Sequence, residues 1–301
     1  MIKTQSAIGM DLTDLEKEKL WEFFPNGIIS IDLETTGLSP LVDRIIEVGA
    51  LKITPSGSHI FQTLINPEIP IPPHTIAIHN ITDEMVKDSP TLIDVLNDLR
   101  EFMGDMPIIA HNAKFDLGFI VLGLQRAKMD LAANDIYCSC KLARQTHMEI
   151  VNHKLSTLVK ELNIPLLNHH RATDDAFAAL KIFMCSLGVI RTPLSPMLKR
   201  YGHLFSLNDF EKLNSEELPE KLSELEKLVK EAAVIEINYS GGNHKNEWRP
   251  VKLTSLLNTP EGNILYARCL WSDIQKSFKL KKITELRHPS AEEIQKWLKK
   301  S

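Results

Sequence analysis

Apolar residues in the first two thirds of the chain recur with two periods, near two and near 3.6, which are the spacings of strands and helices. Three strand-like runs come first, and Pro55-Ser56-Gly57 predicts a hairpin between the second and the third. Helical and strand-like runs then alternate after the proline-rich loop Asn66–Pro73. The predicted strands are Ile28–Leu33, Arg44–Ile53, His59–Ile65, Pro107–His111 and residues 135–140. The predicted helices are Thr13–Phe24, Thr82–Val86, Leu92–Met103, Lys114–Ala127, Lys154–Leu162 and Ala172–Leu187. This order predicts an α/β fold, a mixed five-stranded sheet flanked by helices.

The last third of the chain has a different pattern. Prolines at 193 and 196 interrupt any regular element, and a charged run, Ser215–Glu231, predicts a connecting helix. Short strand-like runs then follow, separated by turn residues, which predicts a small antiparallel sheet or barrel. These runs are Val234–Tyr239, Trp248–Leu257, Ile264–Trp271 and Ser277–Leu286, followed by a helix, Ala291–Lys300. We therefore expect a helical extension (1–26), a first domain (27–190), a helical connector (191–231) and a β-rich domain (232–301).

Composition narrows the class of protein. The chain has 301 residues, 43% of them hydrophobic and 25% charged, which is typical of a soluble globular protein. No apolar run approaches the roughly 20 residues that span a bilayer, and the first residues do not resemble an export signal. Cys138 and Cys140 form a lone C-x-C without a second ligand pair, so we interpret them as buried free thiols of a cytoplasmic protein.

Charge is distributed unevenly. Residues 1–190 hold 16 Lys and Arg against 24 Asp and Glu, whereas residues 191–301 hold 19 against 15. The acidic part argues against a broad basic nucleic-acid surface, but not against a site that meets phosphate through bound cations. The basic part fits a nucleic-acid contact and a solvated charged face equally well.

Three segments carry candidate chemistry. In ISIDLETTGL, Asp32 and Glu34 lie two apart at the end of a buried strand, so both side chains point to one face. Two such carboxylates repel each other, and a bound divalent cation usually neutralises this repulsion. In IIAHNAKFDLGFI, Asp116 falls in the first turn of a helix, which alone is commonplace. In HHRATDDAFAAL, Asp175 borders the apolar face of a helix, and His170 precedes it in the loop, as a general base would.

Together the three segments resemble the motifs D-x-E-T-T-G-L, A-H-N-A-x-F-D and H-R-A-x-x-D-A of the DEDDh, or DnaQ-like, 3′→5′ exonuclease superfamily. The resemblance covers residues 27–188 and implies a ribonuclease H-like fold. It implies Asp32, Glu34, Asp116 and Asp175 as ligands of two Mg²⁺ or Mn²⁺ ions, and His170 as the base. Asp32 would bridge the ions, with Glu34 and Asp175 on the nucleophile side and Asp116 acting more distantly.

The same resemblance implies a substrate cleft. Thr35, Thr36 and Leu38 would lie against the terminal nucleotide, with Leu38 as an apolar wedge, and Asn112 and Phe115 would line the cleft. His79-Asn80-Ile81-Thr82 resembles the family segment H-G-I-T, which adds His79 and Thr82. Asn80 replaces the common glycine and can adopt the same left-handed backbone.

Residues 232–288 resemble a WYL-type domain, a small Sm/SH3-like β-barrel linked to nucleic-acid or nucleotide sensing. The supporting residues include Trp248-Arg249-Pro250 and Phe278-Lys279-Leu280, although the name-giving triplet is not intact. The resemblance implies phosphate contacts for Arg249, Arg268 and Lys279. The alternative is a packed accessory barrel with a solvated basic face.

The sequence leaves three functions to weigh. The first is a DNA 3′→5′ exonuclease acting on single-stranded 3′ ends in proofreading, repair or end trimming, with a polymerase or repair protein as a potential partner. The second is the same chemistry on RNA. The segment Glu34-Thr35-Thr36-Gly37 resembles the DNA-type branch of the superfamily more than its oligoribonuclease branch. The third is a non-catalytic nucleic-acid-binding protein on an exonuclease scaffold, which the intact acidic set disfavours.

Overall fold

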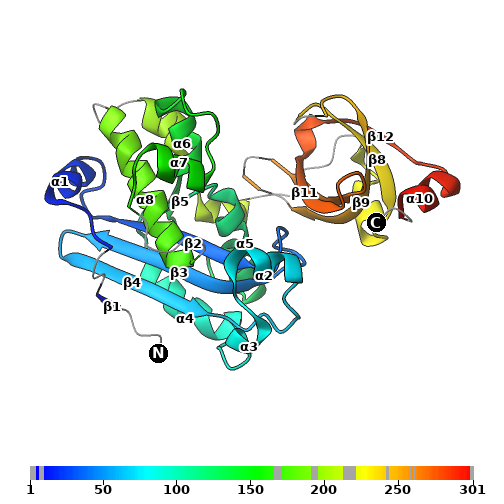
Figure 1. The fold of residues 1–301 in the computed structure, drawn as a ribbon. Helices are drawn as coiled ribbons and strands as arrows, with labels where there is room; N and C mark the ends of the chain where they lie inside the picture. Colours follow the sequence, from blue (N-terminus) through cyan, green and yellow to red (C-terminus); the bar gives the residue numbers. More distant parts are fainter. Residues whose placement is uncertain are drawn as a thin grey trace. The chain divides into compact units, whose positions relative to one another are not determined.

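The computed structural model describes residues 5–6, 10–165, 171–190, 196–212, 222–241, 244–257, 259–260 and 262–298. It divides the chain into two compact units (Figure 1). The first comprises residues 1–36 and 44–208, and the second comprises residues 37–43 and 209–301. The loop 37–43, which directly follows the first acidic motif, is thus grouped with the C-terminal residues.

The first unit is built on a mixed sheet with the strand order β1-β4-β3-β2-β5-β6-β7. Its strands are β1 (Gln5–Ser6), β2 (Ile28–Thr35), β3 (Ile45–Thr54), β4 (Gly57–Leu64), β5 (Ile108–Ala110), β6 (Asp135–Cys138) and β7 (His203–Ser206). β5 runs parallel to β2 and β6, and the remaining pairs are antiparallel. The predicted mixed α/β sheet is confirmed, but five strands was wrong. The two additional strands lie at the edges and are too short to show a period in the sequence.

Helices flank this sheet, as predicted. They are α1 (Asp14–Phe23), α2 (Pro73–His79), α3 (Asp83–Val86), α4 (Leu92–Met103), α5 (Lys114–Arg126), α6 (Ser139–Thr146), α7 (Leu155–Glu161) and α8 (Ala172–Val189). The capping box of α1 between Thr13 and Glu16 is formed as predicted. α2 and α6 were not predicted. α2 begins at Pro73, at the end of the proline-rich loop, and the first residues of α6 were assigned to the predicted strand 135–140. Asn80 adopts the left-handed conformation, with φ 58°, at the end of α2.

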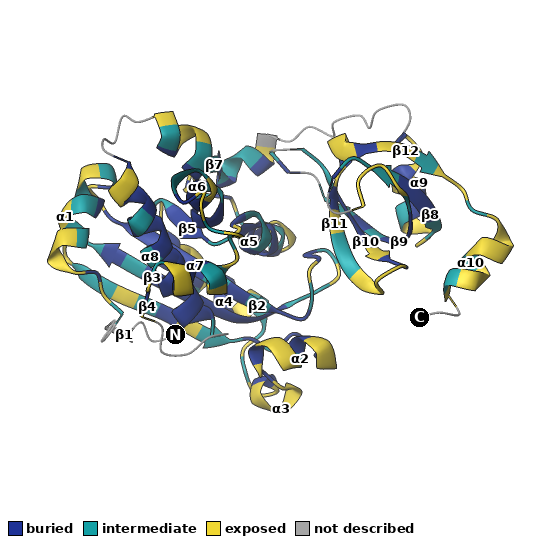
Figure 2. Ribbon diagram, turned by 45° about the horizontal axis from the view of Figure 1, so that its top comes forward, coloured by how far each residue is buried: buried dark blue, intermediate teal, exposed yellow. Residues whose placement is uncertain are grey.

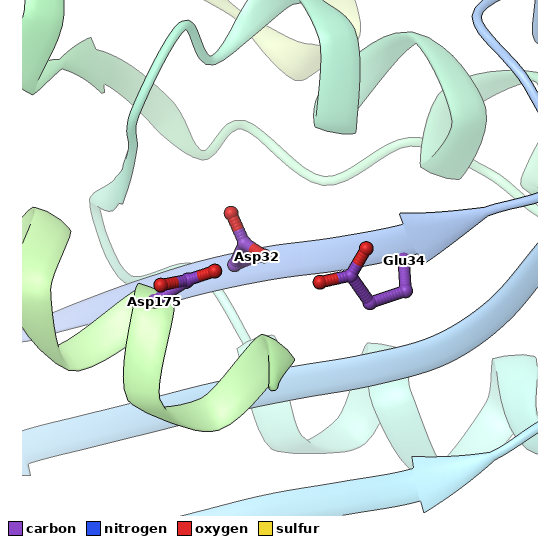
Figure 3. A group of neighbouring side chains, drawn as sticks. All are labelled: Asp32, Glu34 and Asp175. Carbon is purple, nitrogen blue, oxygen red and sulfur yellow. The ribbon is translucent and has the colours of Figure 1, made fainter. Parts of the chain in front are cut away.

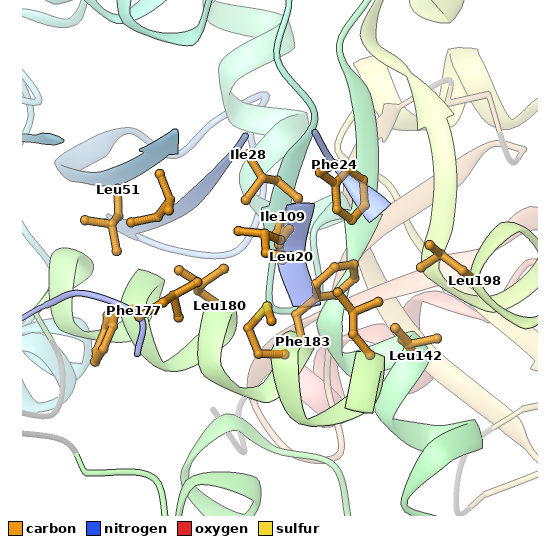
Figure 4. Packing of buried hydrophobic residues seen from close by; sticks show 14 of the residues in the cluster. Leu20, Phe24, Ile28, Leu51, Ile109, Leu142, Phe177, Leu180, Phe183 and Leu198 are labelled. Carbon is orange, nitrogen blue, oxygen red and sulfur yellow. The ribbon is translucent and has the colours of Figure 1, made fainter. Parts of the chain in front are cut away.

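α8 is the central helix of the first unit and packs across β2 and β3 (Figure 1). Its buried face joins Phe177, Leu180 and Phe183 to Ile28 and Leu51 of the strands (Figure 4). The burial view shows this helix and the neighbouring strands as mostly buried (Figure 2). Burial on both sides of β2 and β3 explains why these strands read as continuous apolar runs.

Two small residues bring α8 close to the sheet. The Ser30 hydroxyl donates a hydrogen bond of 2.7 Å to the carbonyl oxygen of Ala176. A Cβ on Gly49 would lie 2.2 Å from the backbone nitrogen of Thr173 and 2.3 Å from the carbonyl carbon of Ala172. Only glycine therefore allows the first turn of α8 to rest on β3. This contact fixes the start of the helix that carries Asp175.

Gly49→Ala is expected to lower the free energy of unfolding by about 1–3 kcal/mol, because the backbone of α8 must move away from β3. Gly188→Ala is the matched control, since a Cβ there meets nothing within 4 Å and alanine favours the helix by about 0.5–1 kcal/mol. Urea unfolding of both variants measures the difference. Equal stabilities of the two variants would contradict the close approach at Gly49.

The second unit contains a five-stranded antiparallel sheet with the order β11-β10-β9-β8-β12. The strands are β8 (Val234–Tyr239), β9 (Trp248–Leu257), β10 (Ile264–Cys269), β11 (Ile274–Lys279) and β12 (Ile283–Arg287). The predicted antiparallel sheet is confirmed. A closed Sm/SH3-like barrel is not, because β11 and β12 at the two ends of the order do not pair with each other. A 3₁₀ turn, Leu280–Lys282, divides the predicted run 277–286 into two strands.

The core of this unit includes Ile235, Val251, Leu265 and Phe278. The helices α9 (Leu225–Lys230) and α10 (Ala291–Leu298) flank the sheet in the sequence. Within the unit, the Ser39 hydroxyl of loop 37–43 lies 2.9 Å from that of Ser255 on β9, and both side chains are buried. Within the described ranges, no helix combines the length and the hydropathy that crossing a bilayer requires.

Candidate active site

β2 positions the first two carboxylates. Asp32 and Glu34 alternate with the buried Ile31 and Leu33, so both point to the face that carries Ser30 and supports α8. Across the sheet, Asp32 pairs with Gly49 and Glu34 pairs with Glu47. The pairing then shifts between Glu34 and Thr35, as at a β-bulge. Bulges of this kind redirect side chains next to functional sites.

α8 supplies the third carboxylate. Asp175 lies in the first turn of the helix, and its side chain points toward Asp32 and Glu34 (Figure 3). One carboxylate oxygen from each of the three residues lies within 4.8 Å of the others. Residues more than 140 positions apart in the chain therefore meet because α8 rests directly on β2 and β3.

Asp116 comes from the first turn of α5 and is 2% exposed. Its Oδ1 accepts a hydrogen bond of 3.2 Å from the backbone N–H of Leu33, which lies between Asp32 and Glu34. Asp116 is therefore adjacent to the same strand, although it is outside the group of three whose oxygens converge. That Asp116 acts more distantly on the ions stays a prediction.

Burial and mutual repulsion dominate the electrostatics of these groups. Desolvation, followed by the charges of Asp116 and Asp175, raises the pKa of Asp32 well above its usual range. Desolvation, followed by the charge of Asp175, raises the pKa of Glu34 to about 8, against an opposing effect of Arg171. Burial also raises the pKa of Asp116 to about 8, although the Leu33 N–H lowers it. A cation would relieve this repulsion.

Glu47 and Arg171 are part of the site, and the sequence analysis missed both. Glu47 is fully buried on β3, and Arg171 Nη2 and Nε donate to its Oε1 at 2.7 and 3.2 Å. The backbone N–H of Ala172 donates to Glu47 Oε2 at 3.2 Å. Glu47 thus fixes the first residues of α8. The available signal was a single acid inside the apolar run IIEVGALKI, because a buried charge requires a partner.

The structure separates the predicted substrate-cleft residues into different environments. Thr36 is buried, and its Oγ1 accepts a hydrogen bond of 2.9 Å from the N–H of Arg44. Thr35 is buried on β2, and Leu38 is 48% exposed in the loop of the second unit. His79 is buried, and its Nδ1 accepts from the N–H of Ile81. Thr82 is exposed at the N-terminus of α3.

The residues of the second motif lie between the end of β5 and the first turn of α5. Asn112 is exposed, with φ 62°, and the Phe115 ring packs on Phe119 at 5.2 Å. His111 Nε2 donates to the His153 carbonyl oxygen at 3.0 Å, and its Nδ1 lies 2.9 Å from the Ser139 hydroxyl. Burial lowers the pKa of His111 to about 4, so it is neutral at pH 7. His170 lies outside the described residues.

The three predicted phosphate contacts of the second unit also differ. Arg249 is 5% exposed. Arg268 donates two hydrogen bonds of 2.6 Å to the carboxylate of Asp273. Lys279 is exposed at the end of β11, where its backbone N–H donates to the Tyr239 hydroxyl. Arg249 is thus the one whose side chain turns to the interior.

The donor set fits a hard divalent cation. Asp32, Glu34 and Asp175 offer only carboxylate oxygens, which suit Mg²⁺ or Mn²⁺ better than softer metals. Within the described residues, this is the group of His, Cys, Asp and Glu side chains close enough to share an ion. Burial and the neighbouring acids raise the pKa of Asp32 and of Glu34, and Arg171 opposes this effect at Glu34.

The affinity for Mn²⁺ is expected to increase between about pH 6 and pH 8. Because the pKa of Glu34 and of Asp116 is raised to about 8, the metal-free site holds protons at neutral pH that a cation must displace. Calorimetric titration in buffers of different ionisation enthalpy measures both the affinity and the protons released. We expect roughly one or more protons to be released at pH 7. Binding without pH dependence or proton release would contradict the assignment.

Comparison with known proteins agrees with this fold. The exonuclease family model, RNase_T, matches residues 29–183, about half of the chain, and includes Asp32, Glu34, Asp116 and Asp175. The chain therefore belongs to this exonuclease family, and its first unit has the ribonuclease H-like exonuclease fold. The exonuclease part of the motif resemblance is confirmed.

Particular relatives are similar over the same part. A DNA polymerase III PolC-type of Oceanobacillus iheyensis is 42% identical over 158 residues, covering 52% of this chain and 11% of that protein. The Bacillus subtilis protein of the same name is 38% identical over 160 residues, with the same coverage. The chain thus matches only about a tenth of the length of these relatives. The solved structure of exonuclease I aligns with a TM-score of 0.50 at 16% identity, covering 90% of this chain and 67% of that one, a likeness of fold alone.

Proposed function

We propose that the chain is a 3′→5′ exonuclease that hydrolyses the terminal phosphodiester bond of DNA and releases 5′-mononucleotides. The convergence of oxygens from Asp32, Glu34 and Asp175 within 4.8 Å carries this proposal. Asp116 beside Leu33 adds a fourth acid to the same strand. Four carboxylates at the start of two helices and the end of one strand are suited to holding two divalent cations near a phosphate.

The chain's own groups have distinct parts in the proposed reaction. When bound, the two cations would supply Lewis-acid activation of water and stabilisation of the leaving 3′ oxygen. Asp32 would contact both ions, Glu34 and Asp175 would hold the one on the nucleophile side, and Asp116 would act through water on the leaving side. His170 would accept the proton of the attacking water. Glu47 and Arg171 would hold α8 so that Asp175 stays in register with β2.

DNA is the favoured substrate. The relatives that are 38–42% identical are named as DNA polymerases. The segment Glu34-Thr35-Thr36-Gly37 also resembles the DNA-type branch of the exonuclease superfamily. We therefore propose removal of 3′-terminal nucleotides during replication or repair, with a polymerase as a potential partner. The test compares 3′-labelled single-stranded DNA, mismatched duplex DNA and RNA of matched sequence in Mg²⁺ and Mn²⁺. Faster cleavage of RNA than of DNA in both ions would replace this substrate with the RNA alternative.

His170→Gln is expected to reduce the rate of nucleotide release about 10²–10⁴-fold, because a general base contributes on that order. His169→Gln is the matched control and should retain most of the activity. Below pH 7 the rate should increase with pH in the wild type and in His169→Gln. Only His170→Gln should lose this increase. Equal losses in the two variants, or a loss only at His169, would reject His170 as the base.

A further inference from the structure

Loop 37–43 is the tip of the hairpin that β2 and β3 form, and β2 is the strand that carries Asp32 and Glu34. Two hydrogen bonds of 2.9 Å close the base of this tip. The N–H of Thr36 donates to the Arg44 carbonyl oxygen, and the N–H of Arg44 donates to Thr36 Oγ1. The hairpin belongs to the first unit, whereas its tip is part of the second. The strand of the first acidic motif therefore continues directly into a segment that packs within the second unit.

The loop is closed on itself, so we expect it to move as one piece. The carboxylate of Asp43 accepts a hydrogen bond of 2.8 Å from the N–H of Ser39. The Ser39 carbonyl oxygen accepts from the N–H groups of Val42 and Asp43, at 3.2 and 2.8 Å. The same carboxylate fills the space beside Gly37, where a Cβ would lie 2.5 Å from it. A contact that fixes Ser39 therefore fixes the rest of the loop.

Ser255 of β9 makes that contact with Ser39. Ser39 is fully buried and Ser255 is 5% exposed, and their hydroxyl oxygens lie 2.9 Å apart. Loss of one hydroxyl would leave the other buried without this partner, which is unfavourable. The pairing of β9 with β10 shifts by one residue between Leu253 and Ser255, as at a β-bulge, and bulges redirect side chains. The hydrogen bond thus joins the loop to a defined point of the second unit's sheet.

The loop also presents apolar side chains to solvent. Leu38 is 48% exposed and Val42 is 44% exposed. Ser39 and Pro40 between them are buried. Leu38 follows Glu34 by four residues, so their Cα atoms are at most about 14 Å apart, which corresponds to about four stacked nucleotides. A strand whose phosphate lies at the carboxylates therefore comes within reach of Leu38, and apolar side chains can pack against bases.

We propose that Ser255 is a positioning residue for the exonuclease reaction, because it holds loop 37–43 through Ser39 and so fixes Leu38 against the substrate strand. The inference rests on the proposed function. The second unit thereby contributes to substrate binding, while the carboxylates of β2 stay in place through their pairing with β3. Loss of the hydrogen bond should accordingly weaken substrate binding and leave the catalytic rate and the Mn²⁺ requirement unchanged.

Steady-state cleavage of 3′-labelled single-stranded DNA by the full chain tests this role. Ser255→Ala is expected to raise KM about two- to tenfold with kcat unchanged, since loss of one hydrogen bond shifts an equilibrium by about that factor. Ser277→Ala is the matched control, because Ser277 is an exposed serine on β11 of the same sheet, and its KM should not change. The double variant Leu38→Ala, Ser255→Ala should have the KM of Leu38→Ala alone, because Ser255 acts through that side chain.

Hydrogen exchange of the substrate-free protein measures the hold on the loop without any cleavage. In Ser255→Ala the amides of Val42 and Asp43 should exchange about two- to tenfold faster, and in Ser277→Ala they should not change. Unchanged exchange in Ser255→Ala would overturn the inference. Faster exchange with an unchanged KM, or with a reduced kcat alone, would also overturn it and leave the proposed function intact. Absence of cleavage by the wild type would instead reject the proposed function, and the positioning role with it.

Discussion

Asp32→Asn is expected to reduce release of 5′-mononucleotides by more than about 100-fold at saturating Mg²⁺ or Mn²⁺. Loss of a group that contacts the ion directly should exceed the 10–100-fold typical of outer-shell partners. The charges of Asp116, Asp175 and Glu34 all raise the pKa of Asp32, so Asp32 lies close to each of them. No neighbouring acid can therefore replace it. Steady-state rates on 3′-labelled single-stranded DNA measure the effect.

The same substitution should stabilise the metal-free protein at pH 8. Carboxylates with a raised pKa bind more protons in the folded than in the unfolded state, so stability decreases as the pH rises from about 4 to about 8. An amide at position 32 removes one of the repelling charges. Its melting temperature in a chelator should therefore exceed that of the wild type at pH 8, and less so at pH 5.

Asp94→Asn is the matched control for Asp32→Asn. Asp94 is exposed and caps α4, where hydrogen bonds from Thr91 lower its pKa. Its amide should leave the activity unchanged and should not stabilise the protein at pH 8. If Asp32→Asn retained activity, or if it lowered the melting temperature of the metal-free protein at pH 8, the carboxylate cluster would not be the centre of the site.

Glu47→Gln is expected to reduce kcat/KM by about 10–100-fold, although Glu47 is not proposed to contact metal or substrate. The neutral amide has one acceptor oxygen where the carboxylate has two, so Arg171 loses its charged partner and either Arg171 or the Ala172 N–H loses a hydrogen bond. The start of α8 is then held less firmly. Arg171 already interacts with Glu34 and would then compete with a cation for it. The Mn²⁺ concentration for half-maximal activity should therefore rise.

Two further variants distinguish positioning from general stability. Gln62→Ala removes only an exposed amide that donates to Glu47 at 3.0 Å, and it should leave the Mn²⁺ requirement unchanged. The double variant Glu47→Gln, Arg171→Met should lose less activity than the two single losses predict, because it removes both partners of one interaction. A lower melting temperature for Glu47→Gln with an unchanged Mn²⁺ requirement would assign Glu47 a purely structural role.

The first unit shows what local patterns can and cannot predict. Strand β2 follows from its apolar run, and the common orientation of Asp32 and Glu34 follows from their spacing of two residues. The meeting of Asp175 with them depends on Gly49, where α8 touches β3, and this long-range contact has no local signature. Asp116 could be assigned only through the motif resemblance, because an acid in the first turn of a helix is common.

In the second unit, the sequence predicted the strands but not the turn between two of them or the environment of each basic side chain. Its strands were predicted from alternating runs, but the run 277–286 contains no Gly or Pro to mark the 3₁₀ turn at Leu280–Lys282. Arg249, Arg268 and Lys279 were equivalent as basic residues near strands. Only the structure shows that Arg249 turns inward whereas Arg268 pairs with Asp273.

Product analysis tests the central claim most directly. Wild-type protein and Asp32→Asn are incubated with 5′-labelled and 3′-labelled single-stranded DNA in Mn²⁺, and the products are separated by length and by the position of the phosphate. We predict that the wild type shortens DNA from the 3′ end and releases 5′-mononucleotides, and that the chelator and Asp32→Asn both abolish this release. Release of 3′-phosphorylated nucleotides, or undiminished release by Asp32→Asn, would contradict the proposed function.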